Sequence, residues 1–168
     1  RMRPKRFASC KMARLLLDAN KKLLQVLDLS AVSAALPLDA VIMAGGVGKR
    51  LRPLTDNIPK PLLKVGDKTI IEHNIDRLAS FGIRDFHITI KYLGEKIKEH
   101  LGNGISKNIS IQYISEAEPL GTVGAVGLIK SFNHEHVLIM NSDLLTNIDF
   151  EDFYKAFLDT KADMAVAT

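Results

Sequence analysis

The chain has 168 residues, of which 46% are hydrophobic and 25% are charged, so we expect one soluble domain with a sizeable core. No apolar stretch approaches the roughly 20 residues of a membrane-spanning helix, which excludes an integral membrane protein. The only cysteine, Cys10, cannot form an internal disulfide. The apolar run at 15–17 is interrupted at once by Asp18, so we also expect no targeting segment and a cytoplasmic protein.

The formal net charge of +4 is unevenly distributed along the chain. The first 22 residues carry +7, and the remainder carries −3. Only Phe7 is available within the basic stretch to stack on a base, so this stretch is more typical of a solvated terminus than of a nucleic-acid interface. We therefore expect neither a nucleic acid nor a membrane as a partner.

Residues 1–38 form a basic segment that precedes the main domain. Within it, apolar runs at 15–17 and 23–29 flank a polar stretch, a pattern that predicts a strand, a turn and a second strand. The same apolar residues also fit one face of a helix from Met12 to Leu27. We favour the strand hairpin and keep the helix as the alternative.

Residues 39–168 alternate short apolar runs with longer segments of helical period. This pattern predicts an α/β domain with a Rossmann-like, mainly parallel sheet flanked by helices. The last apolar run has no continuation, so we expect the domain to be truncated on its C-terminal side. The predicted strands are 40–43, 86–90, 109–114, 137–140 and 164–167, and the predicted helices are 69–78, opened by a Thr69–Glu72 capping box, 94–101, 121–130 and 150–158.

A glycine-rich loop, residues 44–50, follows the first predicted strand of the main domain. In open parallel sheets, ligands bind beyond the carboxyl ends of the strands. Glycines let the backbone turn tightly and bring its N–H groups against phosphate oxygens, and Lys49 and Arg50 add positive charge. The glycine spacing fits neither a Walker loop nor the dinucleotide fingerprint. Taken alone, the loop is equally typical of a phosphate site and of a plain turn.

Two further polar residues occupy chemically unusual positions. Lys60 stands between two prolines, which fix their own φ angles, so we expect a stiff, non-helical segment that presents its ammonium to a phosphate. Asp143 follows the predicted strand 137–140, where a carboxylate is well placed to hold Mg²⁺ on nucleotide phosphates. The alternatives are a solvent-facing lysine and an aspartate that caps a turn.

Four motifs, in this order, resemble those of the sugar-1-phosphate nucleotidyltransferases, also called nucleoside-diphosphate-sugar pyrophosphorylases. The resemblance covers residues 39–168. It implies that this region binds the nucleotide in an enzyme that transfers a nucleoside monophosphate from a triphosphate to a sugar 1-phosphate and releases pyrophosphate. The motifs are AGGVGKRLRPLT at 44–55, PKPL at 59–62, EPLGT at 118–122 and NSD at 141–143.

The resemblance also implies roles for individual residues. Arg50 and Lys60 would act in catalysis by contacting the leaving and reacting phosphates, and Asp143 would bind Mg²⁺. Residues 120–123 are more similar to mannose-1-phosphate guanylyltransferases than to thymidylyltransferases, which favours GTP. Lys49 and Ser142 depart from the family, which commonly has threonine and glycine there. The implied nucleotide-binding residues are Ala44, Gly45, Gly46, Gly48, Lys49, Glu116, Gly121, Thr122 and Asn141.

Family members place a second metal-binding aspartate and most of the sugar pocket beyond the segment that matches this chain. We therefore expect the 168-residue chain to bind a nucleotide with little or no turnover. Residues 1–38 resemble the closing hairpin of a cystathionine-β-synthase-type (CBS-type) regulatory domain, which precedes the catalytic domain in some relatives. A non-catalytic nucleotide-binding module and a cytidylyl- or guanylyltransferase with a non-sugar acceptor remain as alternatives. The sequence does not identify the sugar, and it neither requires nor excludes a homo-oligomer.

The five histidines show no recognised metal-ligand spacing, and no cysteine cluster accompanies them. We expect them to be ordinary packing or surface side chains. They are His73, His87, His100, His134 and His136.

Overall fold

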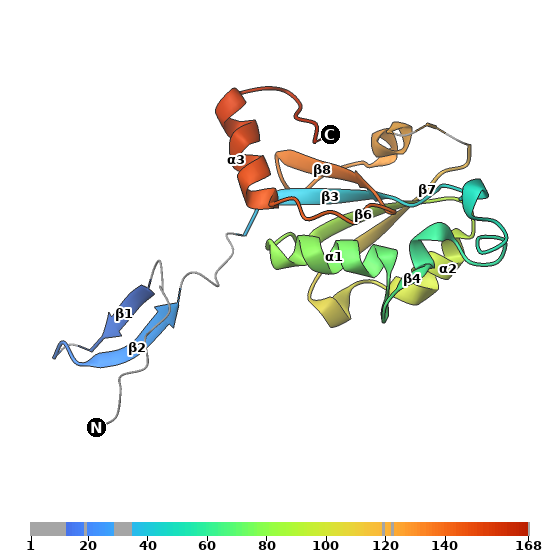
Figure 1. Ribbon diagram of the computed structural model, residues 1–168. Helices are drawn as coiled ribbons and strands as arrows, with labels where there is room; N and C mark the ends of the chain where they lie inside the picture. The colour runs from blue at the N-terminus through green and yellow to red at the C-terminus, as the bar shows by residue number, and fades with distance from the viewer. Residues whose placement is uncertain (1–12, 19, 29–34, 119, 122, 168) are drawn as a thin grey trace. The chain divides into compact units, whose positions relative to one another are not determined.

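The computed structural model describes residues 13–18, 20–28, 35–118, 120–121 and 123–167 (Figure 1). The chain divides into two compact units, residues 1–34 and 35–168. In the described part of the chain, no helix combines the length and the apolar character that crossing a membrane requires.

The first unit contains an antiparallel hairpin of β1 (Ala13–Leu17) and β2 (Leu23–Asp28). The carboxylate of Asp18 organises the turn, because its Oδ1 accepts hydrogen bonds from the N–H groups of Asn20 and Lys22 at 2.9 and 2.8 Å. Aspartate commonly stabilises turns in this way. The predicted strand–turn–strand is confirmed, and the alternative helix is wrong for the described residues, whose backbones pair across the turn.

The second unit is built on a four-stranded parallel sheet with the strand order β7-β6-β3-β8. Each strand lies within two residues of a predicted one, and helices flank the sheet, so the predicted α/β, Rossmann-like class is confirmed. The strands are β3 (Leu38–Met43), β6 (Asp85–Ile90), β7 (Ser110–Ser115) and β8 (His136–Asn141).

Helices α1 (Ile70–Ser80) and α2 (Gly94–Leu101) lie along one face of this sheet (Figure 1). Neighbouring strands align their apolar residues in register on that face; for example, Ile42 pairs with Ile88. Each such buried side chain contributes about 1.5–3 kcal/mol to folding. The core of this face includes Ala40, Ile42, Phe86, Ile88, Ile111 and Met140 from the strands, and Ile71, Ile75, Leu78 and Ile97 from the helices.

Helix α1 begins at the predicted capping box. The Thr69 hydroxyl accepts from the Glu72 N–H, and the Glu72 carboxylate accepts from the Thr69 N–H at 2.9 Å. This reciprocal pair satisfies two backbone donors at the start of the helix. The capping box therefore fixes where the helix starts relative to the strands, and a short hairpin of β4 (Lys64–Val65) and β5 (Lys68–Thr69) leads into it.

The strand order reverses next to β3. The chain runs from β3 to β6 and on to β7 in one direction, and β8 then pairs on the other side of β3. In open α/β sheets, ligands bind in the crevice outside the carboxyl ends of the strands at such a reversal. The chain segments after β3 and β8 are held together there, because the Ser142 N–H donates to the Met43 carbonyl at 3.0 Å.

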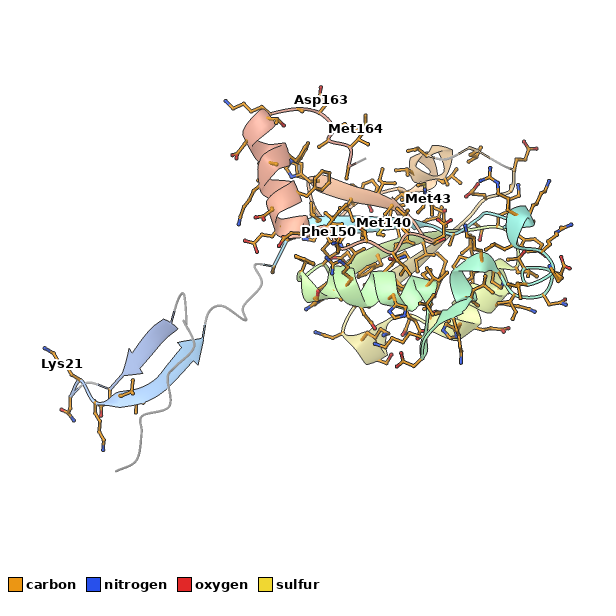
Figure 2. All side chains as sticks on the ribbon, viewed as in Figure 1. Lys21, Met43, Met140, Phe150, Asp163 and Met164 are labelled. Carbon is orange, nitrogen blue, oxygen red and sulfur yellow. The ribbon has the colours of Figure 1, made fainter. Side chains whose placement is uncertain are left out.

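Two predicted elements are wrong. Among the described residues of 121–130, the only helix is a short 3₁₀ helix, η5 (Gly124–Leu128), and the three glycines of this stretch disfavour an α-helix. Residues 164–167 do not form a strand, because they have no partner among the described strands; Figure 2 shows Met164 on the segment that leaves α3 (Phe150–Thr160), and its side chain is 76% exposed.

Candidate functional site

A cavity of about 560 Å³ opens where the four parallel strands end. Its lining comes from the segments that follow β3, β6, β7 and β8, and from the single turn η3 (Lys60–Leu62). This is the edge of the sheet at which the strand order reverses. The cavity therefore occupies the position that the fold favours for a ligand.

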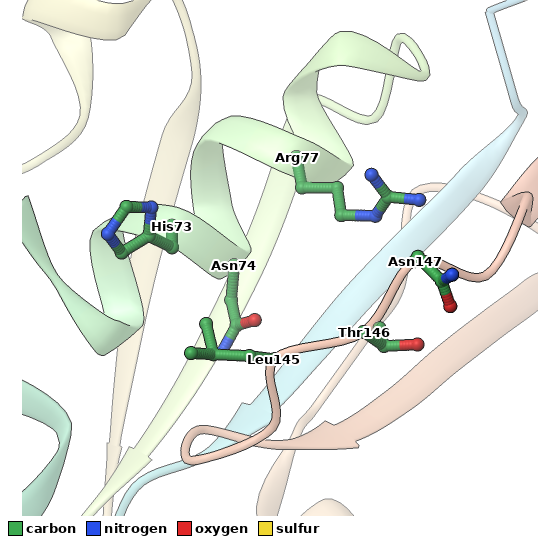
Figure 3. Close-up of a pocket in the computed structure, with 6 residues that line it drawn as sticks. All are labelled: His73, Asn74, Arg77, Leu145, Thr146 and Asn147. Atoms are coloured by element: carbon green, nitrogen blue, oxygen red, sulfur yellow. The ribbon is translucent and has the colours of Figure 1, made fainter. Parts of the chain in front are cut away.

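A second cavity, of about 630 Å³, lies between α1 and the loop after β8 (Figure 3). Its most polar side chain, Arg77, already has structural partners: Nη2 donates to the Ile148 carbonyl at 2.6 Å, and the guanidinium lies over the rings of Phe81 and Phe150. One helix and one loop supply all of its lining. We therefore take the 560 Å³ cavity, which gathers residues from all four strand ends, as the candidate site.

The glycine loop is packed tightly on two sides. A Cβ added at Gly45 would lie 2.9 Å from Oε1 of Glu116, and a Cβ at Gly48 would lie 3.2 Å from Cβ of Lys60. Gly48 also adopts a φ of 65°, which glycine tolerates far better than other residues. The buried Thr55 donates its hydroxyl proton to the Gly48 carbonyl at 2.9 Å. A side chain would therefore be crowded at positions 45 and 48, and glycine leaves only backbone facing the cavity there.

Lys60 and Asp143 form an ion pair at the wall of the cavity. Their side chains are 32% and 33% exposed, so both charged groups remain accessible. Lys60 begins η3, and Leu63 donates its N–H to the Lys60 carbonyl at 3.1 Å. The expected non-helical segment is therefore wrong at Lys60. The fixed φ of Pro61 suits an early position in a helical turn, and the extended residues flank this turn, at Pro59 and Leu63.

The segment that carries Asp143 is fixed on both sides. Ser142 is buried, and its backbone N–H bonds to the end of β3. Its carbonyl accepts from the buried side-chain amide of Asn74, on α1, at 3.0 Å. The carboxylate of Asp143 thus projects from a backbone that the sheet and α1 position together.

Most of the residues predicted for the site line this one cavity. Lys49 and Arg50 do not: they lie exposed in η2 (Lys49–Leu51), next to the glycine loop. Thr122 falls outside the described residues. The predicted residues that line the cavity are Ala44, Gly45, Gly46, Gly48, Lys60, Glu116, Gly121, Asn141 and Asp143.

One cation at the cavity was not predicted. Lys91 follows β6 directly, lines the cavity, and its Cβ would lie 3.4 Å from a Cβ added at Gly45. Ligands bind beyond the carboxyl ends of parallel strands, and Lys91 directly follows the predicted strand 86–90. The same reasoning that singled out the residues after the other strands could therefore have identified Lys91. Lys60 and Lys91 balance the charges of Glu116 and Asp143 in the lining.

A group able to hold a metal ion is present among the described residues, but at the other edge of the sheet. It consists of Asp39, Asp85 and His134, whose ligand atoms all lie within 4.8 Å of one another. Asp39 and Asp85 belong to the amino-terminal ends of β3 and β6, whereas the 560 Å³ cavity lies at their carboxyl ends. Asp143 is not part of this group.

Comparison with known proteins identifies relatives of the second unit. A family model described as "Nucleotidyl transferase" matches residues 39–168. A mannose-1-phosphate guanyltransferase of Schizosaccharomyces pombe is 36% identical over 126 residues, which are 71% of this chain and 35% of that protein. An N-acetylmuramate alpha-1-phosphate uridylyltransferase of Neisseria meningitidis is 38% identical over 115 residues, 67% of this chain and 50% of that protein.

A similar solved structure is HddC from Yersinia pseudotuberculosis, described as complexed with GMP-PN. It superposes with a TM-score of 0.64 at 28% sequence identity, and the match covers 73% of this chain and 55% of that chain. The chain thus spans between a third and somewhat more than half of the length of these three proteins.

Proposed function

Because the chain belongs to the nucleotidyl transferase family, we propose that its second unit binds a nucleoside triphosphate in the 560 Å³ cavity. We propose further that the full-length protein transfers the nucleoside monophosphate to a sugar 1-phosphate and releases pyrophosphate. The observation that carries this proposal is the convergence of the glycine loop, Lys60 and Asp143 on one cavity at the reversal of the strand order.

The glycine loop and the lysines supply what a triphosphate needs. Gly45 and Gly48 present no side chain to the cavity, so the phosphates can approach backbone N–H groups closely. Lys60 and Lys91 line the same cavity and add positive charge. Arg50 lies just outside, in η2, where it would meet the leaving pyrophosphate only after its exposed side chain turns inward.

Asp143 is our candidate for Mg²⁺. The described cavity lining contains two carboxylates, Glu116 and Asp143, and only Asp143 is already paired with a cation, Lys60. A hard divalent ion prefers such oxygen ligands and completes its shell with water and phosphate oxygens. When bound, Mg²⁺ supplies charge stabilisation at the phosphates. Lys60 would then exchange its carboxylate partner for a phosphate oxygen.

The reaction we propose is a direct displacement at the α-phosphorus. An oxygen of the sugar 1-phosphate forms a bond to this phosphorus, and the bond from the α-phosphorus to the bridging oxygen breaks as pyrophosphate leaves. Negative charge spreads over the transferring and leaving groups, and Lys60 is positioned to stabilise it. The protein therefore contributes orientation and electrostatics, and no covalent enzyme intermediate is needed.

GTP is the nucleotide we propose. The relative from S. pombe is named a guanyltransferase, the HddC structure is described with GMP-PN, and residues 120–123 match the guanylyltransferase pattern. The relative from N. meningitidis is named a uridylyltransferase, which makes UTP the relevant competitor. Gly121 lines the cavity and has no atom within 4 Å of an added Cβ, so its backbone is open to a base.

Two further proposals concern the rest of the chain. We infer that residues 1–38 close a CBS-type regulatory domain, a proposal supported by the antiparallel pairing of β1 and β2. We also infer that the protein works in the cytoplasm, because its single cysteine gives it no internal disulfide. A measurement of its mass in solution tests whether it forms a homo-oligomer.

The proposed function is tested by titrating the 168-residue chain calorimetrically with GTP, UTP, ATP and CTP, with and without Mg²⁺. We expect GTP to bind most tightly and Mg²⁺ to strengthen its binding. The full-length gene product is assayed in parallel for pyrophosphate release with several sugar 1-phosphates. Binding without any turnover at full length would favour a non-catalytic module, and the absence of any nucleotide binding would refute the proposal.

A further inference from the structure

The amino-terminal edge of the sheet holds a cluster that the proposed reaction does not use. Asp39 of β3 and Asp85 of β6 are register partners in the parallel pair, and His134 lies in the connection that leads to β8. Nδ1 of His134 is 3.2 Å from Oδ2 of Asp39 and 4.0 Å from Oδ2 of Asp85. One imidazole nitrogen therefore faces two carboxylate oxygens, one from each strand.

The other oxygen of each carboxylate is held by a neighbouring side chain. Oδ1 of Asp39 lies 3.3 Å from Nε2 of His87, and Oδ1 of Asp85 accepts from the side-chain amide of Asn133 at 2.8 Å. In addition, the backbone N–H of His134 donates to Oδ2 of Asp39 at 2.7 Å. Metal-binding carboxylates are oriented by outer hydrogen bonds of this kind.

The charges of this cluster are not balanced by basic side chains. Asp39 is fully buried, and within the described residues the ion pairs of Asp39 and Asp85 involve histidine alone. His87 is 2% exposed, and its Nδ1 is buried without a hydrogen-bond partner. Its other ring nitrogen, Nε2, lies 3.3 Å from Oδ1 of Asp39. Among the described residues, the one partly exposed imidazole beside the two carboxylates is that of His134.

We propose that this cluster is a site for a divalent transition-metal ion, with Zn²⁺ as the favoured ion. Oδ2 of Asp39, Oδ2 of Asp85 and Nδ1 of His134 would be the protein ligands, and water would complete the shell. A tetrahedral zinc site with bonds of about 2.0–2.1 Å separates its ligand atoms by about 3.4 Å. The two separations from Nδ1 of His134 are 3.2 and 4.0 Å, and all three ligand atoms lie within 4.8 Å of one another. Mixed carboxylate and imidazole donors favour zinc over magnesium.

The consequence of metal binding at this place is structural. The ion would join β3, β6 and the connection before β8 at the sheet edge opposite the 560 Å³ cavity. It would neutralise the two carboxylates and leave His87 and Asn133 as positioning residues. This inference is independent of the proposed reaction, so either can fail without the other.

The experiment is a titration of the chelator-treated, tag-free 168-residue chain with Zn²⁺, by calorimetry and by thermal unfolding. A parallel titration with Co²⁺ reports tetrahedral coordination through its visible absorption. We expect one ion per chain, a higher unfolding temperature, and at least a tenfold loss of affinity in Asp85→Asn and in His134→Asn. Asn133→Ala, which removes only an orienting hydrogen bond, should weaken binding by about 10–100-fold while the Co²⁺ spectrum stays tetrahedral.

The matched control is His100→Asn. His100 also contacts a carboxylate, that of Glu72 at 3.2 Å, but lies outside the cluster, so this variant should bind zinc like the parent chain. Asp85 and His134 are 23% and 31% exposed at their side chains, and circular dichroism without metal checks that their variants fold. Equal zinc affinity in the parent chain, Asp85→Asn and His134→Asn would overturn the proposal, as would a loss of binding in His100→Asn alone.

Discussion

The ammonium of Lys60 and the carboxylate of Asp143 form an ion pair across a separation of 83 residues in the sequence. Each side chain is about one-third exposed, and ion pairs at such positions contribute only about 0–1 kcal/mol. Opening the pair therefore costs little. Under the proposed function, a magnesium–nucleotide complex would offer both residues a new partner, a phosphate for Lys60 and the ion for Asp143, so the pair would exchange partners at little cost.

The first prediction concerns this pair. Lys60→Met and Asp143→Asn should each lower pyrophosphate release by the full-length protein about a hundredfold or more. Lys60→Met removes a positive charge that stabilises the transition state, and Asp143→Asn removes the proposed ligand of the Mg²⁺ that does the same. The double variant should lose less than the product of the two effects, since the residues act on the same phosphates. Steady-state turnover is measured for the two single variants and the double variant. The control is Lys64→Met, because Lys64 is an exposed residue of β4. Turnover near the parent level in either single variant would refute the role assigned to that residue.

The second prediction concerns the glycine loop. Gly48→Ala should destabilise the chain by about 1–2 kcal/mol, because its φ of 65° is costly for alanine and the new Cβ would crowd Thr55 and Lys60. Nucleotide affinity should fall as well. Gly46→Ala is the matched control for stability: nothing lies within 4 Å of its added Cβ. Denaturant unfolding compares these two variants, and nucleotide titration compares Gly48→Ala with the parent chain. Equal stabilities of the two variants would show that the backbone at Gly48 is not constrained.

The third prediction concerns Lys91. Lys91→Ala should weaken GTP binding about tenfold, because a charge-assisted contact to a phosphate contributes about 1.5–3 kcal/mol before screening. The effect should shrink as salt is added. Calorimetric titrations at two ionic strengths measure the affinity and its salt dependence. Lys130 is exposed and does not line the cavity, so the control variant Lys130→Ala should leave the affinity unchanged. A salt-independent effect would point to packing instead of charge.

The fourth prediction concerns the start of α1. Burial of the Glu72 carboxylate raises its pKa, but hydrogen bonds from Thr69 and His100 outweigh burial and lower the pKa from 4.5 to about 2. A carboxyl whose pKa is depressed by folding stabilises the fold above its unfolded pKa and loses this contribution as pH falls through its folded value. The parent chain should therefore exceed Glu72→Gln in stability at neutral pH, and the difference should vanish between about pH 4.5 and pH 2.

Glutamine keeps the hydrogen bonds of the capping box, so this comparison isolates the charge of Glu72. Urea unfolding across that pH range measures the difference. Glu95→Gln, in the exposed first turn of α2, is the control and should not reproduce the pH dependence. A difference between parent and Glu72→Gln that stayed constant down to pH 2 would contradict the low pKa.

Much of the fold was predictable because local signals agreed with tertiary packing. Short apolar runs between segments of helical period located the four strands of the sheet, and Thr69 with Glu72 marked the start of α1. The stretch 121–130 misled because its apolar spacing suggests a helix while Gly121, Gly124 and Gly127 oppose one. Residues 164–167 have strand-like composition, but strand formation depends on a hydrogen-bonding partner that composition alone does not reveal.

The candidate site was predictable for those residues that directly follow a strand, because ligands bind beyond the carboxyl ends of parallel strands. The glycine loop, Glu116 and Asp143 all follow a strand, and so does Lys91. This position does not determine side-chain direction, so it could not show that Arg50 lies outside the cavity lining. The cluster of Asp39, Asp85 and His134 was out of reach because its members come from three segments and no short spacing connects them.

The closeness of Gly45 to Glu116 has an evolutionary consequence. Oε1 of Glu116 lies 2.9 Å from the place of a Cβ added at position 45. Because this oxygen is the end of a flexible side chain, a larger residue at position 45 would turn Glu116 aside, so the two positions should be selected together. The nucleotide loop and the end of β7, 71 residues away in the chain, would then be inherited as one unit.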